Sequence, residues 1–288
     1  MSELIVDGLT VRFAGLTALD AVDFTVPEGS VHAVIGPNGA GKSTCFNVLS
    51  GVYRATEGSV RFGDAELTTL PPHKIAALGV ARTFQNIALS SLQNVENNLM
   101  LGRHRLTRAG FASAGLRLPH ARREDARHRG RVREIARFVG VSEYLDAPVG
   151  MLPYGVQKRV ELARALAMEP RLLLLDEPVA GMNGDERRRM AEVIVAARAD
   201  LGLSILLVEH DMGMVMKLAD RVTVLDFGRR IADGTPDEVQ RDPAVIRAYL
   251  GAAHTVDAAD LTADAADLTA GAGQRKPGAE QEKAEERA

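Results

Sequence analysis

Eight consecutive residues carry the clearest chemistry in the sequence, because their pattern is that of a loop able to wrap around phosphate oxygens. They are Gly36, Pro37, Asn38, Gly39, Ala40, Gly41, Lys42 and Ser43, and Thr44 directly after them is a further candidate for nucleotide binding. Glycine backbones adopt dihedral angles that turn several N–H groups toward one anion. The loop follows an apolar run at 31–35 and opens a predicted helix at 42–49, whose positive dipole end points at the same anion. The pattern predicts a nucleotide site in which Lys42 reaches the β- and γ-phosphates and Ser43 holds Mg²⁺.

Two adjacent carboxylates form a second candidate site. Asp176 and Glu177 directly follow a run of four leucines at 172–175, which is typical of a buried strand. Parallel sheets bind their ligands at the carboxyl ends of the strands. We therefore expect Asp176 to hold Mg²⁺ in concert with Ser43, and Glu177 to polarise a water that attacks the γ-phosphate.

A histidine and a glutamine follow two further predicted strands. His210 comes after the apolar run at 204–208, and Gln85 comes after the run at 80–84. The same topological rule places both side chains at the ligand edge of the sheet. His210 is suited to donate a hydrogen bond to a γ-phosphate, and Gln85 to contact the metal or the attacking water.

The elements that position these residues alternate between strands and helices, which predicts a parallel α/β core. Two early segments with alternating apolar and polar residues, 4–13 and 19–26, predict an additional antiparallel pair. The other expected strands are 31–35, 59–62, 80–84, 172–175, 204–208, 221–225 and 230–232. Helices are expected at 42–49, 72–79, 157–167, 185–201 and 236–240, and through most of 94–140, with a short loop at 152–156.

Composition excludes several classes of protein. The chain has 288 residues, a formal net charge of −3 and one cysteine, Cys45. A single cysteine excludes an intramolecular disulfide and favours a reducing cytoplasm. No apolar N-terminal leader and no apolar run of about 20 residues is present. The arginine-rich stretch at 94–140 has few interleaved aromatic residues for base stacking, so we expect a solvated or protein-contacting helical surface and no nucleic-acid partner.

Taken together, these motifs and spacings resemble the ATP-binding subunits of ABC transporters over nearly all of residues 1–251. The phosphate loop corresponds to the family's Walker A motif, and residues 172–176 to its Walker B motif. The resemblance implies that Glu177 is the catalytic glutamate, Gln85 the Q-loop glutamine and His210 the switch histidine, with Lys42 also at the reacting phosphate. It further implies that Phe13 stacks on adenine, and that ATP and Mg²⁺ are the cofactors.

One motif of this family is altered here. The signature LSGGQ is replaced by residues 152–156, in which Gly155 is kept and Pro153 stands in the serine position. Proline offers neither a hydroxyl nor an N–H to the ATP of a facing subunit. Contact with that ATP is then expected from Gly155, other backbone N–H groups and the helix dipole.

Within the family, the segments at 80–86 and 232–251 and the long helical insert resemble the ATPases of branched-chain amino acid importers. Related ATPases for urea or amide import and for lipopolysaccharide export share much of this pattern. A soluble ABC protein usually carries two cassettes or a long coiled coil, and this chain has neither. A P-loop kinase or GTPase needs neither the 152–156 segment nor His210, and Glu177 with His210 argues against a module that binds nucleotide without hydrolysing it.

The resemblance also implies an architecture and an assembly. The fold is expected to be a RecA-like P-loop NTPase core with an antiparallel β subdomain, at about 1–88 and 168–251, and an inserted helical subdomain at about 89–167. Residues 252–288 contain a DAADLTA repeat and predict a disordered tail. Expected partners are a second ABC ATPase subunit, either self or a paralogue, transmembrane permease subunits that meet the segment at about 86–98, and indirectly a solute-binding protein. The expected location is the cytoplasmic face of the cell membrane.

Overall fold

The computed structural model describes residues 3–85, 87–107 and 118–249. The chain divides into two units, 1–246 and 247–288, and every candidate site residue belongs to the first unit. The predicted disordered tail at 252–288 lies outside the described residues, and the subdomain boundaries at 88 and 167 stay predictions. Within the described residues, no helix is both long and apolar enough to cross a bilayer.

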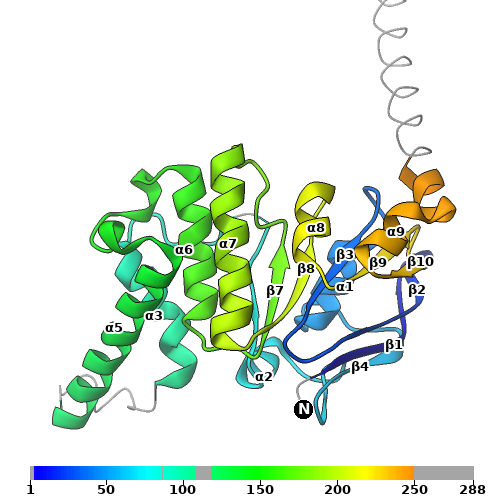
Figure 1. Cartoon of the computed structure of the whole chain (residues 1–288). Helices are drawn as coiled ribbons and strands as arrows, with labels where there is room; N and C mark the ends of the chain where they lie inside the picture. The colour runs from blue at the N-terminus through cyan, green and yellow to red at the C-terminus, as the bar shows by residue number, and fades with distance from the viewer. Residues whose placement is uncertain (1–2, 86, 108–117, 250–288) are drawn as a thin grey trace, which may run out of the picture. The chain divides into compact units, whose positions relative to one another are not determined.

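A six-stranded sheet forms the centre of this unit, with the strand order β10-β9-β3-β8-β7-β6. Its strands are β3 (Val31–Ile35), β6 (Val80–Arg82), β7 (Leu172–Asp176), β8 (Ser204–Val208), β9 (Arg221–Asp226) and β10 (Arg229–Gly234). The five strands from β9 to β6 are parallel, and β10 pairs with β9 as an antiparallel hairpin. The predicted parallel core is therefore confirmed, and its carboxyl ends lie along one edge (Figure 1).

A second, antiparallel sheet has the order β2-β1-β4-β5. It consists of β1 (Leu4–Phe13), β2 (Leu16–Val26), β4 (Glu57–Phe62) and β5 (Ala65–Glu66). The expected antiparallel pair is confirmed, and β2 begins three residues earlier than predicted because the tight turn at Ala14 and Gly15 lets pairing start at once, with Leu16 opposite Phe13.

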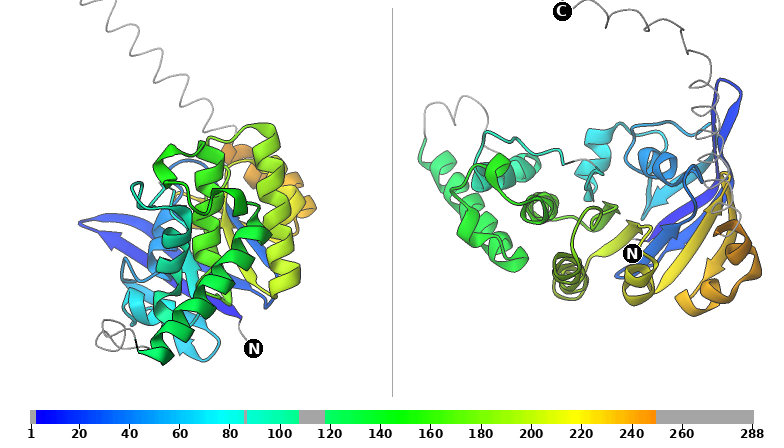
Figure 2. Two further views of the ribbon diagram at one scale, coloured as in Figure 1. Left: turned by 90° about the vertical axis from the view of Figure 1, so that its left-hand side faces the viewer. Right: turned by 90° about the horizontal axis from the view of Figure 1, so that it is seen from above.

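Helices cover the central sheet and form the insert between β6 and β7. They are α1 (Lys42–Leu49), α2 (Pro72–Ala77), α3 (Val95–Arg103), α5 (Pro119–Val139), α6 (Tyr154–Leu166), α7 (Gly184–Leu201), α8 (Met212–Leu218) and α9 (Pro236–Arg241), with short 3₁₀ turns at η1 (His104–Leu106), η2 (Ser142–Tyr144) and η3 (Val149–Met151). Figure 2 shows the insert helices at the end of this unit opposite the antiparallel sheet.

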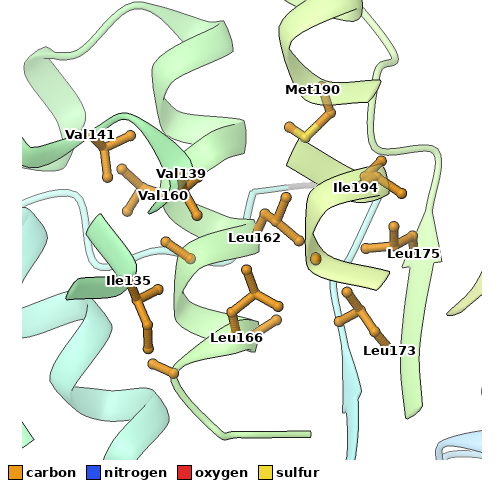
Figure 3. Close-up of a cluster of buried hydrophobic side chains, with 14 of the residues drawn as sticks. Ile135, Val139, Val141, Val160, Leu162, Leu166, Leu173, Leu175, Met190 and Ile194 are labelled. Atoms are coloured by element: carbon orange, nitrogen blue, oxygen red, sulfur yellow. The ribbon is translucent and has the colours of Figure 1, made fainter. Parts of the chain in front are cut away.

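Strand periodicity divides the apolar residues between two cores. In β7, Leu173 and Leu175 pack with α6 and α7, as Figure 3 shows, whereas Leu172 and Leu174 face the other side of the sheet. The second core joins that side to α1 and the antiparallel sheet. Because side chains alternate along a strand, a buried parallel strand must be apolar on both faces. The four leucines before Asp176 therefore fix the strand whose end carries the two carboxylates.

Two further predicted boundaries, both next to candidate site residues, are wrong. The strand expected at 80–84 ends at Arg82, because the chain leaves the sheet after Thr83 donates its N–H to Leu174 O at 3.0 Å. The loop expected at 152–156 ends at Pro153, since α6 already begins at Tyr154. Proline fixes its own φ and is tolerated at a helix start, and both Val156 and Gln157 donate their N–H to Pro153 O at 3.0 Å.

A buried histidine in the central sheet makes the stability of the protein pH-dependent. His32 lies in β3 with no exposed surface, and its Nε2 lies 2.8 Å from Thr223 Oγ1, which donates to Asp233 Oδ2 at 2.6 Å. Burial lowers the pKa of His32 from 6.5 to about 4; the charge of Asp233 opposes this shift, and the charge of Arg221 adds a smaller lowering. The imidazole is therefore neutral in the folded protein over a range in which it is protonated in the unfolded chain.

Between pH 6.5 and pH 4 the unfolded chain binds a proton that the folded protein does not, so stability falls as the pH is lowered. The His32 contribution to this loss reaches about 3 kcal/mol at pH 4, at about 1.4 kcal/mol for each unit of pKa difference. We expect His32→Gln to reduce the loss of unfolding free energy between pH 7 and pH 4.5, measured by urea titration at each pH. Parallel pH profiles for the two proteins would contradict the assignment.

Candidate functional site

The phosphate loop connects β3 to α1 at the carboxyl edge of the sheet. Gly36 has φ +149° and Gly41 has φ +100°. A Cβ at Gly36 would lie 2.1 Å from Leu225 O, and one at Gly41 would lie 2.7 Å from Ala18 O. Both positions thus exclude a side chain for steric as well as conformational reasons. The loop is held between β2 and the β9–β10 turn, and α1 begins directly after Gly41.

Lys42 lies at the start of α1 and turns back over the loop. Its Nζ donates to Gly36 O at 2.7 Å and to Pro37 O at 2.8 Å, and the residue is buried. Burial lowers the pKa of Lys42, and the nearby Glu177 and Asp176 oppose that effect. The ammonium group is therefore pre-positioned within the loop, close to both carboxylates.

Asp176 ends β7 and is paired with an arginine that no motif in the sequence marks as a site residue. Arg82 Nη2 lies 2.9 Å from Asp176 Oδ2, and both side chains are almost completely buried. The same guanidinium donates to Asn47 Oδ1 at 2.8 Å and Ser50 Oγ at 2.7 Å in and after α1. Its carbon lies 5.3 Å from the ring centre of Phe84. Arg82 thus connects the end of β7 to the helix that carries the phosphate loop.

Glu177, Gln85 and His210 come together at the edge of the sheet. Gln85 Nε2 donates to Glu177 Oε2 at 3.1 Å, and His210 Nδ1 lies 3.9 Å from Glu177 Oε1. Glu177 has φ +47°, an unfavourable conformation for a residue with a side chain. Its N–H donates to Val208 O at 2.9 Å, which fixes that conformation against β8. The carboxylate therefore projects into a polar cluster supplied by three separate strands.

A second glutamate, Glu209, is buried next to this cluster. The sequence motifs do not identify it as a site residue. It has no exposed surface, and its carboxylate accepts N–H groups from Val179 at 3.0 Å, His210 at 3.1 Å and Asp211 at 3.4 Å. Burial raises its pKa, and these hydrogen bonds oppose the rise. Glu209 thereby joins the segment after Glu177 to the segment that carries His210.

The segment at 152–156 has its own structural constraints. Pro153 provides no side-chain cap for α6. Gly155 is buried, and a Cβ there would lie 2.2 Å from Glu186 Oε1. The other oxygen of Glu186 accepts the N–H of Asn183 at 3.1 Å as part of the capping box of α7. A side chain at 155 would therefore displace the Glu186 carboxylate that belongs to the capping box of α7.

Phe13 lies at the end of β1 with 41% of its surface exposed. Its only ring contact among the described residues is an edge-to-face one with Tyr53, whose centre is 5.2 Å away. An exposed aromatic ring next to a second one is available for stacking on a planar ligand.

The donor set at the sheet edge fits Mg²⁺ bound mainly through phosphates. Asp176 has one oxygen engaged by Arg82, and Ser43 is exposed at the start of α1. Magnesium usually takes one or two protein oxygens together with phosphates and water. The described part of the chain has no group of three or more His, Cys, Asp or Glu side chains suited to a metal.

Comparisons with known proteins agree with this geometry. The family model described as ABC transporter matches residues 19–180, and that described as branched-chain amino acid ATP-binding cassette transporter matches residues 229–255. The high-affinity branched-chain amino acid transport ATP-binding protein BraF of Pseudomonas aeruginosa is 41% identical over 87% of this chain and 98% of its own length. LivG of Escherichia coli, with the same description, is 40% identical over 87% and 98%.

A solved structure of an ABC transporter cassette is also similar to this chain. The ADP conformation of an ATP-binding cassette of an ABC transporter superposes with a TM-score of 0.76 and 30% identity, covering 87% of this chain and 99% of that one. The RecA-like fold expected from the sequence is therefore confirmed.

Proposed function

Because the chain belongs to the ABC transporter family as an ATP-binding, ATP-hydrolysing cassette, we propose that it powers the import of branched-chain amino acids. The observation that carries the solute class is the combination of the 229–255 match with about 40% identity along almost the whole length of BraF and LivG.

In the proposed site, the phosphate loop and the N-terminus of α1 bind the β- and γ-phosphates, with Lys42 as the cation. Phe13 stacks on the adenine ring. Ser43, Asp176 and Gln85 hold Mg²⁺, which when bound neutralises charge on the phosphates. The support is that Lys42 is buried and bonded within the loop, and that the charges of Glu177 and Asp176 act on its ammonium group.

Glu177 is proposed as the group that accepts a proton from the attacking water. Gln85 donates to Oε2 of this carboxylate, and Oε1, which lies 3.9 Å from His210 Nδ1, is the oxygen we propose to face the water. His210, on the opposite side at 3.9 Å, is placed to donate a hydrogen bond to the γ-phosphate as charge develops there. In this proposal Glu177, Gln85 and His210 would surround the γ-phosphate and its attacking water, as the positioning needed for phosphoryl transfer requires.

We further propose that two cassettes face each other head to tail. The first turn of α6 at Gly155 would meet the γ-phosphate bound by the partner, because a helix N-terminus with no side-chain cap presents free N–H groups to an anion. The membrane partners are permease subunits, and the cassette is then held at the inner face of the membrane. Light scattering of Glu177→Gln on a sizing column tests the assembly, with a mass that doubles only when ATP and Mg²⁺ are added.

Uptake of labelled amino acids tests the solute class. In the source organism, deletion of the gene is expected to lower uptake of leucine, isoleucine and valine but not of lysine. Wild-type chain restores uptake, and Glu177→Gln does not, although it accumulates equally. Unchanged leucine uptake in the deletion strain would contradict the proposal.

A further inference from the structure

Three charged side chains on one face of α6 contact the segment that carries Gln85. Lys158 Nζ donates to Gln85 O at 2.8 Å and to Phe84 O at 3.4 Å. Glu161 Oε1 accepts the N–H of Phe84 at 3.3 Å. One turn further on, Arg164 Nη1 donates to Ala88 O at 2.5 Å. The spacing of three residues keeps all of these groups on one side of the helix.

Lys158 and Glu161 form an almost completely buried ion pair. Each side chain is 2% exposed, and their charged atoms are 3.7 Å apart. A buried ion pair contributes little net stability, because desolvation offsets the attraction, so packing alone does not favour it over two apolar residues. What the pair provides here is hydrogen bonding to the backbone of Phe84 and Gln85 just beyond the end of β6, where no strand partner holds the chain.

We propose that Lys158 and Glu161 are positioning residues that fix Gln85 against Glu177 and join it rigidly to α6. Gln85 is held on its backbone side by Lys158 and on its side-chain side by Glu177. A movement of α6 therefore moves Gln85 relative to the carboxylate. The same helix begins at Tyr154 and Gly155, the end that is proposed to face the partner's ATP. That end and Gln85 of the chain's own site are therefore expected to move together.

This inference rests on the proposed role of Gln85 and is tested with the full-length chain. In the variant Lys158→Met/Glu161→Leu, apolar groups of similar size replace the pair, an exchange that is often neutral for stability. We expect its melting temperature to fall by only a few degrees, because the backbone groups of Phe84 and Gln85 lose their partners. ATP affinity should stay near that of the wild type while kcat falls about 10- to 100-fold, since a small displacement of a positioned group has that effect. Adding Gln85→Ala to this variant is expected to change kcat by less than about twofold, because the positioning of Gln85 has already been lost.

Hydrogen exchange provides a readout that does not depend on hydrolysis. In the wild-type structure the Phe84 amide donates to Glu161, so this amide is expected to exchange faster in the Lys158→Met/Glu161→Leu variant. Arg159→Met is the matched control, because Arg159 lies on the same helix but donates to Gly140 O at 2.7 Å instead. It is expected to leave both kcat and Phe84 exchange unchanged.

Two results would overturn the inference. One is an unchanged exchange rate of the Phe84 amide in the Lys158→Met/Glu161→Leu variant. The other is a kcat in the triple variant that is lowered by the product of the separate effects of this variant and of Gln85→Ala. A wild-type chain that fails to hydrolyse ATP would instead refute the proposed function, and the exchange comparison would still decide whether the pair holds the segment.

Discussion

Arg82→Met is expected to lower the free energy of unfolding by about 3–5 kcal/mol, because it leaves the Asp176 carboxylate buried without its cation. The two side chains are 9% and 6% exposed and lie 2.9 Å apart. The variant also loses the hydrogen bonds to Asn47 and Ser50 on the phosphate-loop helix. Urea titration of purified protein measures the loss directly.

An exposed arginine provides the control for this change. Arg188 pairs with Asp185 at 3.7 Å, but both side chains are more than 70% exposed, and such pairs contribute at most about 1 kcal/mol. Arg188→Met should therefore leave stability nearly unchanged. The second substitution Asp176→Asn is expected to recover part of the loss in Arg82→Met, since it removes the uncompensated charge. A loss below about 1 kcal/mol in Arg82→Met would contradict the importance of this pair.

Lys42→Met is expected to weaken ATP binding about 10- to 150-fold, because a hydrogen bond to a charged group contributes about 1.5–3 kcal/mol. In the structure the ammonium group lies over Gly36 O and Pro37 O, inside the loop that would hold the phosphates. Methionine keeps the apolar stem and removes only the charge and its donors. Calorimetric titration with ATP and Mg²⁺ gives the dissociation constant.

The matched control is Lys217→Met, because Lys217 is an exposed lysine in α8 far along the chain from the loop. It removes the same charge and should leave the dissociation constant within about twofold of the wild type. A similarly small change in Lys42→Met would show that the phosphate loop binds ATP through its backbone alone.

Local patterns made much of this site predictable from the sequence. Glycine spacing defines the phosphate loop, and the apolar run at 172–175 places Asp176 and Glu177 at a strand end without knowledge of the fold. The rule that parallel strands share one carboxyl edge then predicts that Gln85 and His210 approach them, and they do lie together. Their catalytic roles remain predictions.

The supporting residues were not predictable in the same way. Arg82 and Asp176 are 94 positions apart, and nothing local to either one identifies the other as its partner. Glu209 follows a strand as His210 does, but only burial reveals that its carboxylate faces inward onto three N–H groups. The predicted start of α6 is wrong because Pro153 in the altered signature is equally compatible with a longer loop and with a helix that begins directly after it.

Steady-state ATP hydrolysis by Glu177→Gln tests the central claim most directly. Glutamine keeps the shape and the contact with Gln85 but cannot accept a proton from water at neutral pH, so the change removes general-base catalysis alone. We predict a kcat lowered by about 10²–10⁴-fold, with the dissociation constant for ATP within about threefold of the wild type. A variant that hydrolyses ATP within about threefold of the wild-type rate would contradict the assignment of Glu177 as the base.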